Sequence, residues 1–179
     1  MAIVSLLQGI GGELTEDLEI TEFLGRHDIM FERWPIPTHI QDLAKQPILN
    51  DEEKGQVLEA FRPKLDELAE TQGYVDSDMV CLSPETPGLH DALGKFDLEH
   101  YHTDEEVRFI VDGRGVFGFM GDDGRRFTIE VNAGEYIIIP ENSWHWFYLL
   151  EDQTIKALRI FKDTSGWTPH YREIKRGGA

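Results

Sequence analysis

The sequence predicts one α+β domain, mainly β, in which helical segments come first and short strands follow. Helical periodicity dominates up to residue 73, whereas short apolar runs and glycine-rich turns dominate from residue 74 onward. A length of 179 residues suits a single domain with a full core. We therefore expect a single domain with mostly helical cover over 1–73, barrel strands over 74–165 and a tail over 166–179.

The first helix is expected soon after the start of the chain. Thr15 is a candidate N-cap, and Gly25 can end the helix. Between them, Leu18, Phe23 and Leu24 would share one apolar face.

A second helical region begins at Asn50, where Glu53 three residues later is typical of a capping box. Pro63 should kink this helix or split it in two, and Gly73 can end it. The region has one apolar stripe, formed by Val57, Leu58, Phe61, Leu65 and Leu68.

The strands are expected to be short and antiparallel. Gly121-Asp122-Asp123-Gly124 predicts a hairpin turn after the strand at 116–120, and glycines 113 and 115 should close the strand at 106–111. Such closely spaced strands favour a sandwich or barrel, with the helices packed outside. We expect strands at 30–34, 79–82, 106–111, 116–120, 127–131, 136–139, 144–150 and 155–161.

The composition excludes several partners. With 34 acidic and 17 basic side chains the net charge is −17, so we expect no nucleic acid and no membrane partner. An anionic substrate would need locally placed arginines. Cys81 is the only cysteine and allows no intramolecular disulfide. The chain does not start with the basic segment of a signal peptide, and no apolar run approaches the about 20 residues that span a membrane. We therefore expect a cytoplasmic protein.

One segment carries ionisable side chains that share parity: His100, His102, Glu106 and Arg108. If the segment is extended, these side chains point to one face, and the apolar residues 107, 109 and 111 point to the other. A polar inner face is costly unless a metal or polar partners satisfy it. This pattern predicts a metal site.

His145, near the start of another apolar strand, is the expected fourth ligand. Three imidazoles and one carboxylate suit Fe, Ni, Mn, Co or Zn and leave two positions open for a chelating substrate. The alternative is that a lone histidine is an ordinary surface residue. We expect that alternative for His27, His39, His90 and His170.

Arg108 is the second candidate for function, because a guanidinium that points inward needs an anion. The alternative is a surface arginine paired with one of the many acidic groups. Arg159 lies similarly on an apolar strand and could face the same interior, whereas Asp104 reads as part of a solvated turn.

These residues resemble the two cupin motifs. The first motif is matched by Gly94-x5-His100-x-His102-x3-Glu106-x6-Gly113, and the second by Gly134-x5-Pro140-x4-His145. Asn142 replaces the usual glycine of the second motif, and Leu149 stands where asparagine is common. The resemblance implies a cupin fold, a double-stranded β-helix or jelly-roll-like barrel.

Within the cupins, the chain resembles the acireductone dioxygenase family of the methionine salvage pathway. The similarity covers 31–34, 99–102, 106–109, 145–147, 159–161 and 166–167. It implies that the four candidate ligands bind one Fe(II) or Ni(II) ion per chain. It further implies oxidation of 1,2-dihydroxy-5-(methylthio)pent-1-en-3-one by O₂. The Fe(II) form would give formate and 4-methylthio-2-oxobutanoate, and the Ni(II) form CO, formate and 3-methylthiopropanoate.

The resemblance also implies roles for residues around the metal. Arg108 would hold the substrate as its dianion, Glu99 matches a position linked to metal incorporation, and Glu105 falls where the family often has aspartate and where conformational signals are thought to pass. Residues matching the substrate pocket are Phe96, Phe147, Arg159 and Trp167. For the three aromatic residues, ordinary core packing is the alternative.

Two other readings stay open at this point: a different mononuclear cupin enzyme, such as another dioxygenase or a sugar isomerase, and a non-enzymatic cupin binding module. A sugar-phosphate isomerase would need several inward cations, and few candidates exist. A binder that had lost catalysis would be expected to have lost a ligand. We expect a monomer, since no exposed strand or coiled-coil seam demands a partner.

Overall fold

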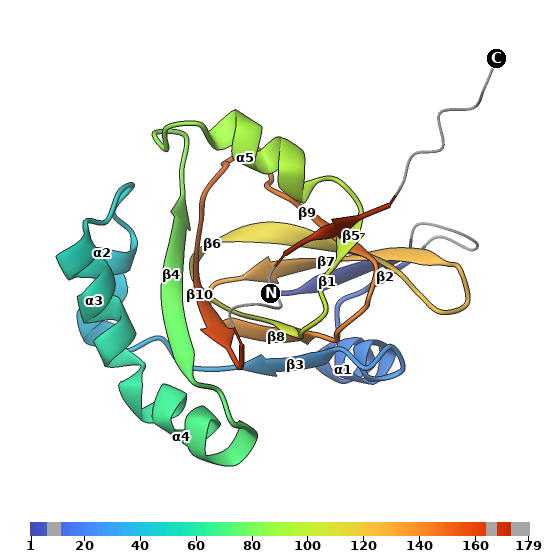
Figure 1. Ribbon diagram of the computed structural model, residues 1–179, viewed down its shortest axis with the longest axis horizontal. Coiled ribbons are helices and arrows are strands. Elements are labelled where there is room, and N and C mark those ends of the chain that lie inside the picture. Colours follow the sequence, from blue (N-terminus) through green and yellow to red (C-terminus); the bar gives the residue numbers. More distant parts are fainter. Residues whose placement is uncertain (7–11, 164–167, 173–179) are drawn as a thin grey trace.

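The computed structural model describes residues 1–6, 12–163 and 168–172 (Figure 1). Its helices are α1 (Asp17–Gly25), η1 (Thr38–Ile40), α2 (Gln41–Ala44), α3 (Asp51–Ala60), α4 (Arg62–Gln72) and α5 (Leu89–Phe96). Its strands are β1 (Ile3–Leu6), β2 (Glu13–Leu14), β3 (Met30–Arg33), β4 (Asp76–Leu82), β5 (His100–Tyr101), β6 (Glu106–Met120), β7 (Arg126–Asn132), β8 (Glu135–Ile139), β9 (His145–Tyr148), β10 (Ile155–Phe161) and β11 (His170–Tyr171). None of the described helices is long and apolar enough to cross a membrane.

The strands form two antiparallel sheets that share β6. Residues 106–109 of β6 pair with β8, and residues 107–113 pair with β10, which places β4 and β3 at the edges of the first sheet. Residues 114–120 pair with β7, and residues 116–119 pair with β9. The second sheet runs in the order β11-β5-β9-β6-β7-β1-β2. This α+β, mainly β architecture is the predicted fold class.

The core has two parts, one inside the barrel and one between the barrel and the helices. The inner part joins residues of both sheets, such as Phe117, Ile137 and Ala157. The outer part packs the first sheet against α3 and α4, which lie beside β4 in Figure 1. Residues 107, 109 and 111 belong to this outer part, which confirms their predicted outward direction.

The helical region that starts at Asn50 forms as predicted. The Asn50 side chain accepts a hydrogen bond from the Glu53 backbone N–H, and the Glu53 carboxylate accepts one from the Asn50 N–H. Pro63 lies in the first turn of α4, so the predicted helix is split in two near Phe61. Gly73 ends α4 in the left-handed conformation, with φ of 77°.

Helix α1 ends at Gly25 as predicted, but its predicted N-cap and the predicted direction of Leu18 were wrong. Glu16, not Thr15, precedes the helix, and it makes no side-chain capping bond. Leu18 is 70% exposed, whereas Ile20 and Leu24 are fully buried. Ile20 and Leu24 are one turn apart and face the barrel together, so Leu18, about 200° around the helix from Ile20, points to solvent.

Several strands differ from the sequence prediction. The predicted strands at 106–111 and 116–120 are parts of one 15-residue strand, β6, and Gly113 does not interrupt it. Lys156 pairs with Asp112 and Ala157 with Ile110, so β6 bulges at residue 111 and continues. Helix α5 and the short strands β1, β2, β5 and β11 were not predicted. The strands are too short to show a clear period, whereas α5 has apolar residues at 89, 92, 93 and 96, a helical spacing that could have predicted it.

Candidate metal centre

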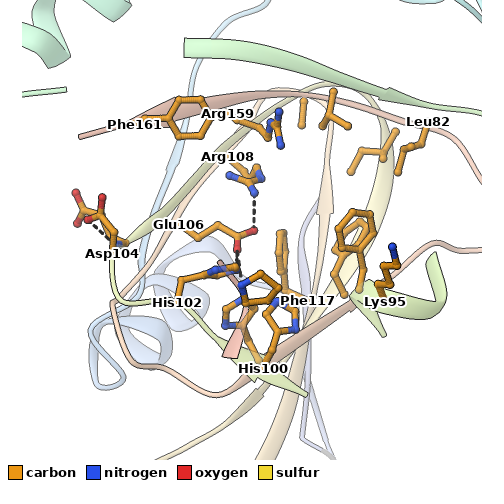
Figure 2. Close-up of a pocket in the computed structure, with 18 of the residues that line it drawn as sticks. Leu82, Lys95, His100, His102, Asp104, Glu106, Arg108, Phe117, Arg159 and Phe161 are labelled. Carbon is orange, nitrogen blue, oxygen red and sulfur yellow. Dashed lines mark hydrogen bonds and ion pairs between the residues drawn. The ribbon is translucent and has the colours of Figure 1, made fainter. Parts of the chain in front are cut away.

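Three histidines and one glutamate meet inside the barrel. They are His100 on β5, His102 just after it, Glu106 at the start of β6 and His145 at the start of β9. One possible ligand atom from each lies within 4.8 Å of all the others. Figure 2 shows His100, His102 and Glu106 converging on one point. The structure therefore brings together all four residues that the sequence singled out as ligands.

The backbone that positions them is not extended throughout, which was the condition for His100, His102 and Glu106 to share one face of a strand. β5 ends at Tyr101, and residues 102–105 form a bend before β6 begins. The side chains still meet, because His100 is the direct cross-strand partner of His145 and because the His102 carbonyl accepts a hydrogen bond of 2.8 Å from the Asn142 N–H. Asn142 has φ of 59°, a left-handed conformation that suits the glycine it replaces in the cupin motif.

The donor set fits a six-coordinate metal ion. At about 2.1 Å from an octahedral ion, neighbouring donor atoms are roughly 3.0 Å apart. In the structure, His102 Nε2 and His145 Nε2 each lie 3.2 Å from Oε2 of Glu106. A mixed imidazole and carboxylate set with this spacing suits Fe, Ni, Mn, Co or Zn.

Backbone carbonyls orient two of the imidazoles. His100 Nδ1 lies 2.6 Å from the Leu98 carbonyl oxygen, and His145 Nδ1 lies 2.8 Å from that of Ser143. Each Nδ1–H can donate to its carbonyl, which leaves Nε2 with a free lone pair directed at the cluster. Burial lowers the pKa of His100, so this imidazole favours the neutral form that binds metal.

Glu106 and Arg108 form an ion pair at the edge of the cluster. Arg108 Nη2 lies 3.1 Å from Glu106 Oε1, as Figure 2 shows, and Nη1 donates to the Val107 carbonyl over 3.0 Å. Burial alone would raise the pKa of Glu106, but Arg108 and the histidines hold it well below its ordinary value. The carboxylate is therefore ionised and ready to bind a cation, and Arg108 points inward as predicted.

Arg159 extends this charged row across the first sheet. It stands directly between Asp78 of β4 and Arg108 of β6 in the strand register. Its guanidinium forms a two-point contact with Asp78, with Nε 2.6 Å from Oδ1 and Nη2 2.5 Å from Oδ2. The structure thus confirms that Arg159 faces the interior, and it identifies Asp78 as the carboxylate that holds it.

A cavity of about 270 Å³ opens next to the cluster. The four candidate ligands, Arg108 and Arg159 line one part of it, and Phe96 and Phe147 are also in its wall. The rest of the wall is mainly apolar, including Leu82, Ile110, Phe117 and Ile155. Phe96 is 40% exposed, so it is a rim residue and not a core residue. Trp167, also expected here, lies outside the described residues.

The two other predicted glutamates have distinct surroundings. Glu105 lines the cavity, accepts a hydrogen bond of 2.6 Å from the Tyr74 hydroxyl and lies 2.7 Å from Lys162 Nζ. Glu99 instead pairs with Arg126 at 3.7 Å and with Arg172 at 3.3 Å.

Sequence reasoning missed two contributors to the site. Asp78 could have been found, because it shares strand parity with residues that face the cavity, Val80 and Leu82. Tyr171, which lines the cavity from β11, carried no signal, since a two-residue strand near the end of the chain has no periodicity.

An antiparallel barrel with three imidazoles and one carboxylate directed into its interior defines the class of metal-binding cupins. Within that class, the chain belongs to the ARD/ARD' family, whose model matches residues 29–169.

Curated relatives and a solved structure agree with this membership. Acireductone dioxygenase of Leptospira interrogans is 41% identical over 160 residues, which cover 89% of this chain and 90% of that protein. The Bacillus subtilis acireductone dioxygenase is 36% identical over 97% of both chains. The structure of acireductone dioxygenase from Bacillus anthracis with a cadmium ion in its active centre has a TM-score of 0.88 at 36% identity, covering 96% of this chain and 98% of that one.

Proposed function

We propose that this protein is a metal-dependent acireductone dioxygenase, which oxidises 1,2-dihydroxy-5-(methylthio)pent-1-en-3-one with O₂. One observation carries the proposal: a complete set of three histidines and a glutamate shares a cavity with an inward arginine, in a chain of this family. We further propose His100, His102, Glu106 and His145 as the ligands of one Fe(II) or Ni(II) ion per chain.

The bound metal would supply a Lewis acid with open positions at which the substrate chelates. The protein's own side chains would first supply positive charge beside the bound substrate. Arg108 lies within hydrogen-bond distance of Glu106 at the cluster, so its fixed positive charge faces the place where the enediol oxygens would lie. In a chain of net charge −17, this local cation offsets the general repulsion of an anion.

Arg159 would add a second cation to the same wall. Its tie to Asp78 keeps the guanidinium against β4, so it supports the substrate from the side next to Arg108. Together the two arginines favour the doubly deprotonated substrate over the neutral enediol, because opposite charge stabilises the ionised form.

The apolar part of the cavity suits the methylthio side chain. Phe117 and Phe147 pack with ring centroids 4.9 Å apart, and Phe147 and Ile155 both line the cavity. Burying a thioether against aromatic rings is favourable and excludes water from the reacting atoms. We propose Phe96 and Phe147 as residues of this substrate pocket. The same role for Trp167, which lies outside the described residues, is proposed from the family resemblance alone.

The metal would decide the product in this proposal. Loading with Fe(II) should give formate and 4-methylthio-2-oxobutanoate, and loading with Ni(II) should give CO, formate and 3-methylthiopropanoate. We propose that the enzyme acts as a monomer, since one chain supplies the complete set of proposed ligands and the site needs no residue from a partner.

The decisive test combines His102→Ala with a matched control, His39→Ala, which changes an exposed histidine on η1. After loading with Fe(II) or Ni(II), metal content is measured by elemental analysis, and oxygen uptake and products are measured with synthetic acireductone. The wild type and His39→Ala should hold about one ion per chain and consume O₂, whereas His102→Ala should do neither. Full metal occupancy and turnover in His102→Ala would refute the ligand assignment. A metal-loaded wild type that consumes no O₂ with acireductone would refute the activity.

A further inference from the structure

The last described strand lies against the strand that carries the first proposed ligand. In the antiparallel pair of β11 and β5, Tyr171 stands opposite His100 and His170 opposite Tyr101. Figure 1 shows β11 beside β5, near the C-terminal end of the chain. The family match ends at residue 169, before this strand begins.

Tyr171 separates the proposed metal centre from solvent on this side. Its ring centroid is 5.8 Å from that of His100, and its side chain lines the cavity. Tyr171 is 43% exposed, whereas His100 is only 5% exposed. One side of Tyr171 thus faces the site and another faces water, as expected for a covering residue.

Among the described residues, most of the side-chain contacts that hold this cover involve Arg172. The Arg172 N–H donates to the Glu99 carbonyl over 3.3 Å, and Arg172 Nη1 lies 3.3 Å from Glu99 Oε2. The Arg172 guanidinium also lies 4.7 Å from the ring centroid of Trp144, and His170 stacks on Tyr101 at 4.9 Å. A two-residue strand held by partly exposed contacts opens far more readily than a central strand.

We propose that the Glu99–Arg172 pair latches β11 over the His100 side of the metal centre, and that Tyr171 is the wall residue that controls access of metal ion and solvent. The inference rests on the proposed metal centre. Glu99 and Arg172 act through Tyr171 and are positioning residues.

A cover and a support for the ligands make different kinetic predictions. Loosening a cover exposes the site in both directions, so metal uptake and metal loss speed up together while the affinity changes little. Weakening the support of a ligand speeds loss alone and lowers the affinity. Measuring both rates therefore separates the latch from a structural role of Glu99.

The experiment uses Ni²⁺ alone and the full-length protein. Uptake by apoprotein and loss to a chromogenic chelator are followed for the wild type, Arg172→Gln, Glu99→Gln and Tyr171→Ala. Removing one partly exposed ion pair should speed both uptake and loss about two- to fivefold. The double variant Glu99→Gln/Arg172→Gln should exchange Ni²⁺ only slightly faster than either single variant, because all three variants lack the same ion pair. Tyr171→Ala should accelerate both processes at least as much.

Two variants serve as matched controls. Arg126→Gln removes the other arginine that faces Glu99, at 3.7 Å, but Arg126 is on β7 and not on the latched strand. Its exchange rates should equal those of the wild type. Tyr171→Phe keeps the covering ring, and no hydrogen bond of the Tyr171 hydroxyl is found among the described residues, so its rates should also be unchanged.

Wild-type exchange rates in Arg172→Gln and Tyr171→Ala would overturn the proposal, as would faster loss with unchanged uptake. An equal acceleration in Arg126→Gln would also overturn it, because loss of positive charge near Glu99 would then explain the effect. A wild type that takes up no Ni²⁺ is a different result: it refutes the proposed metal centre itself.

Discussion

The buried ion pair between Lys156 and Asp112 predicts an unequal response to removing either partner. Lys156 Nζ lies 3.1 Å from Asp112 Oδ2, and their side chains are 0% and 23% exposed, respectively. The change Asp112→Asn leaves a fully buried ammonium without its counter-charge. The change Lys156→Met leaves a carboxylate that water can still reach.

The sizes of the two effects follow from this difference in exposure. Breaking a buried pair so that a charge stays uncompensated costs about 3–5 kcal/mol, and this figure applies to Asp112→Asn. Lys156→Met replaces the buried stem with an apolar side chain of similar length and leaves a hydrated carboxylate, so its cost should be about 1 kcal/mol or less. In the double variant, the cost should fall well below the sum of the single changes.

Urea denaturation of the four proteins in the presence of a chelator measures these values without any contribution from bound metal. The slope of the transition should stay constant across the series, so that midpoints report stability alone. If Lys156→Met destabilises the protein as much as Asp112→Asn or more, the reasoning from exposure is wrong.

Three further predictions concern the site and the turns. Arg108→Met should keep the metal but weaken anaerobic binding of acireductone roughly 100-fold, measured by the spectrum of the bound substrate; an unchanged spectrum and affinity would contradict its role as the anion partner. Gly113→Ala should cost clearly more than the about 1–2 kcal/mol of left-handed strain expected for Gly124→Ala. A Cβ at Gly113 would lie 2.1 Å from the Thr154 carbonyl oxygen, whereas a Cβ at Gly124, which has a similar φ, would meet no neighbouring atom within 4 Å. Equal melting temperatures of the two variants would contradict this. Stripping the metal should lower the melting temperature, by an amount that corresponds to about 2.7 kcal/mol when free metal is 100 times its Kd; identical melting with and without chelator would show that the fold does not hold a metal.

The metal centre was predictable because its pattern is largely local. His100, His102 and Glu106 lie within one short stretch, and their spacing carries the signal whether or not the stretch is a regular strand. The side chains of Glu106 and Arg108 do share a face, as parity predicts, because both lie on β6. The expectation of an extended chain failed only at 102–105.

The contributors that escaped prediction depend on contacts between distant segments. Lys156 lies within the predicted strand 155–161, but nothing in the sequence analysis predicts its full burial beside Asp112 in the first sheet. Tyr171 is placed by the β11–β5 pairing, and both strands are too short to be predicted from the sequence pattern. Only tertiary contacts could reveal these positions.

In the helices, too, features set by local sequence were predictable and features set by tertiary packing were not. The end of α4 at Gly73 and the capping box at Asn50 depend on local chemistry, and both were predictable. The orientation of α1 depends instead on which of its apolar residues pack against the barrel. Ile20 and Leu24 are the buried ones, and Leu18 is left exposed.

Because β6 belongs to both sheets and pairs with β7, β8, β9 and β10, the centre of neither sheet can open without breaking hydrogen bonds to β6. The barrel should therefore unfold as one cooperative unit. Amide hydrogens along 106–120 should exchange with solvent only through global unfolding, whereas those of β11 should exchange through local opening. The proposed metal centre lies between these two strands: Glu106 is the first residue of β6, where exchange should be slow, and His100 pairs with β11, where exchange should be fast.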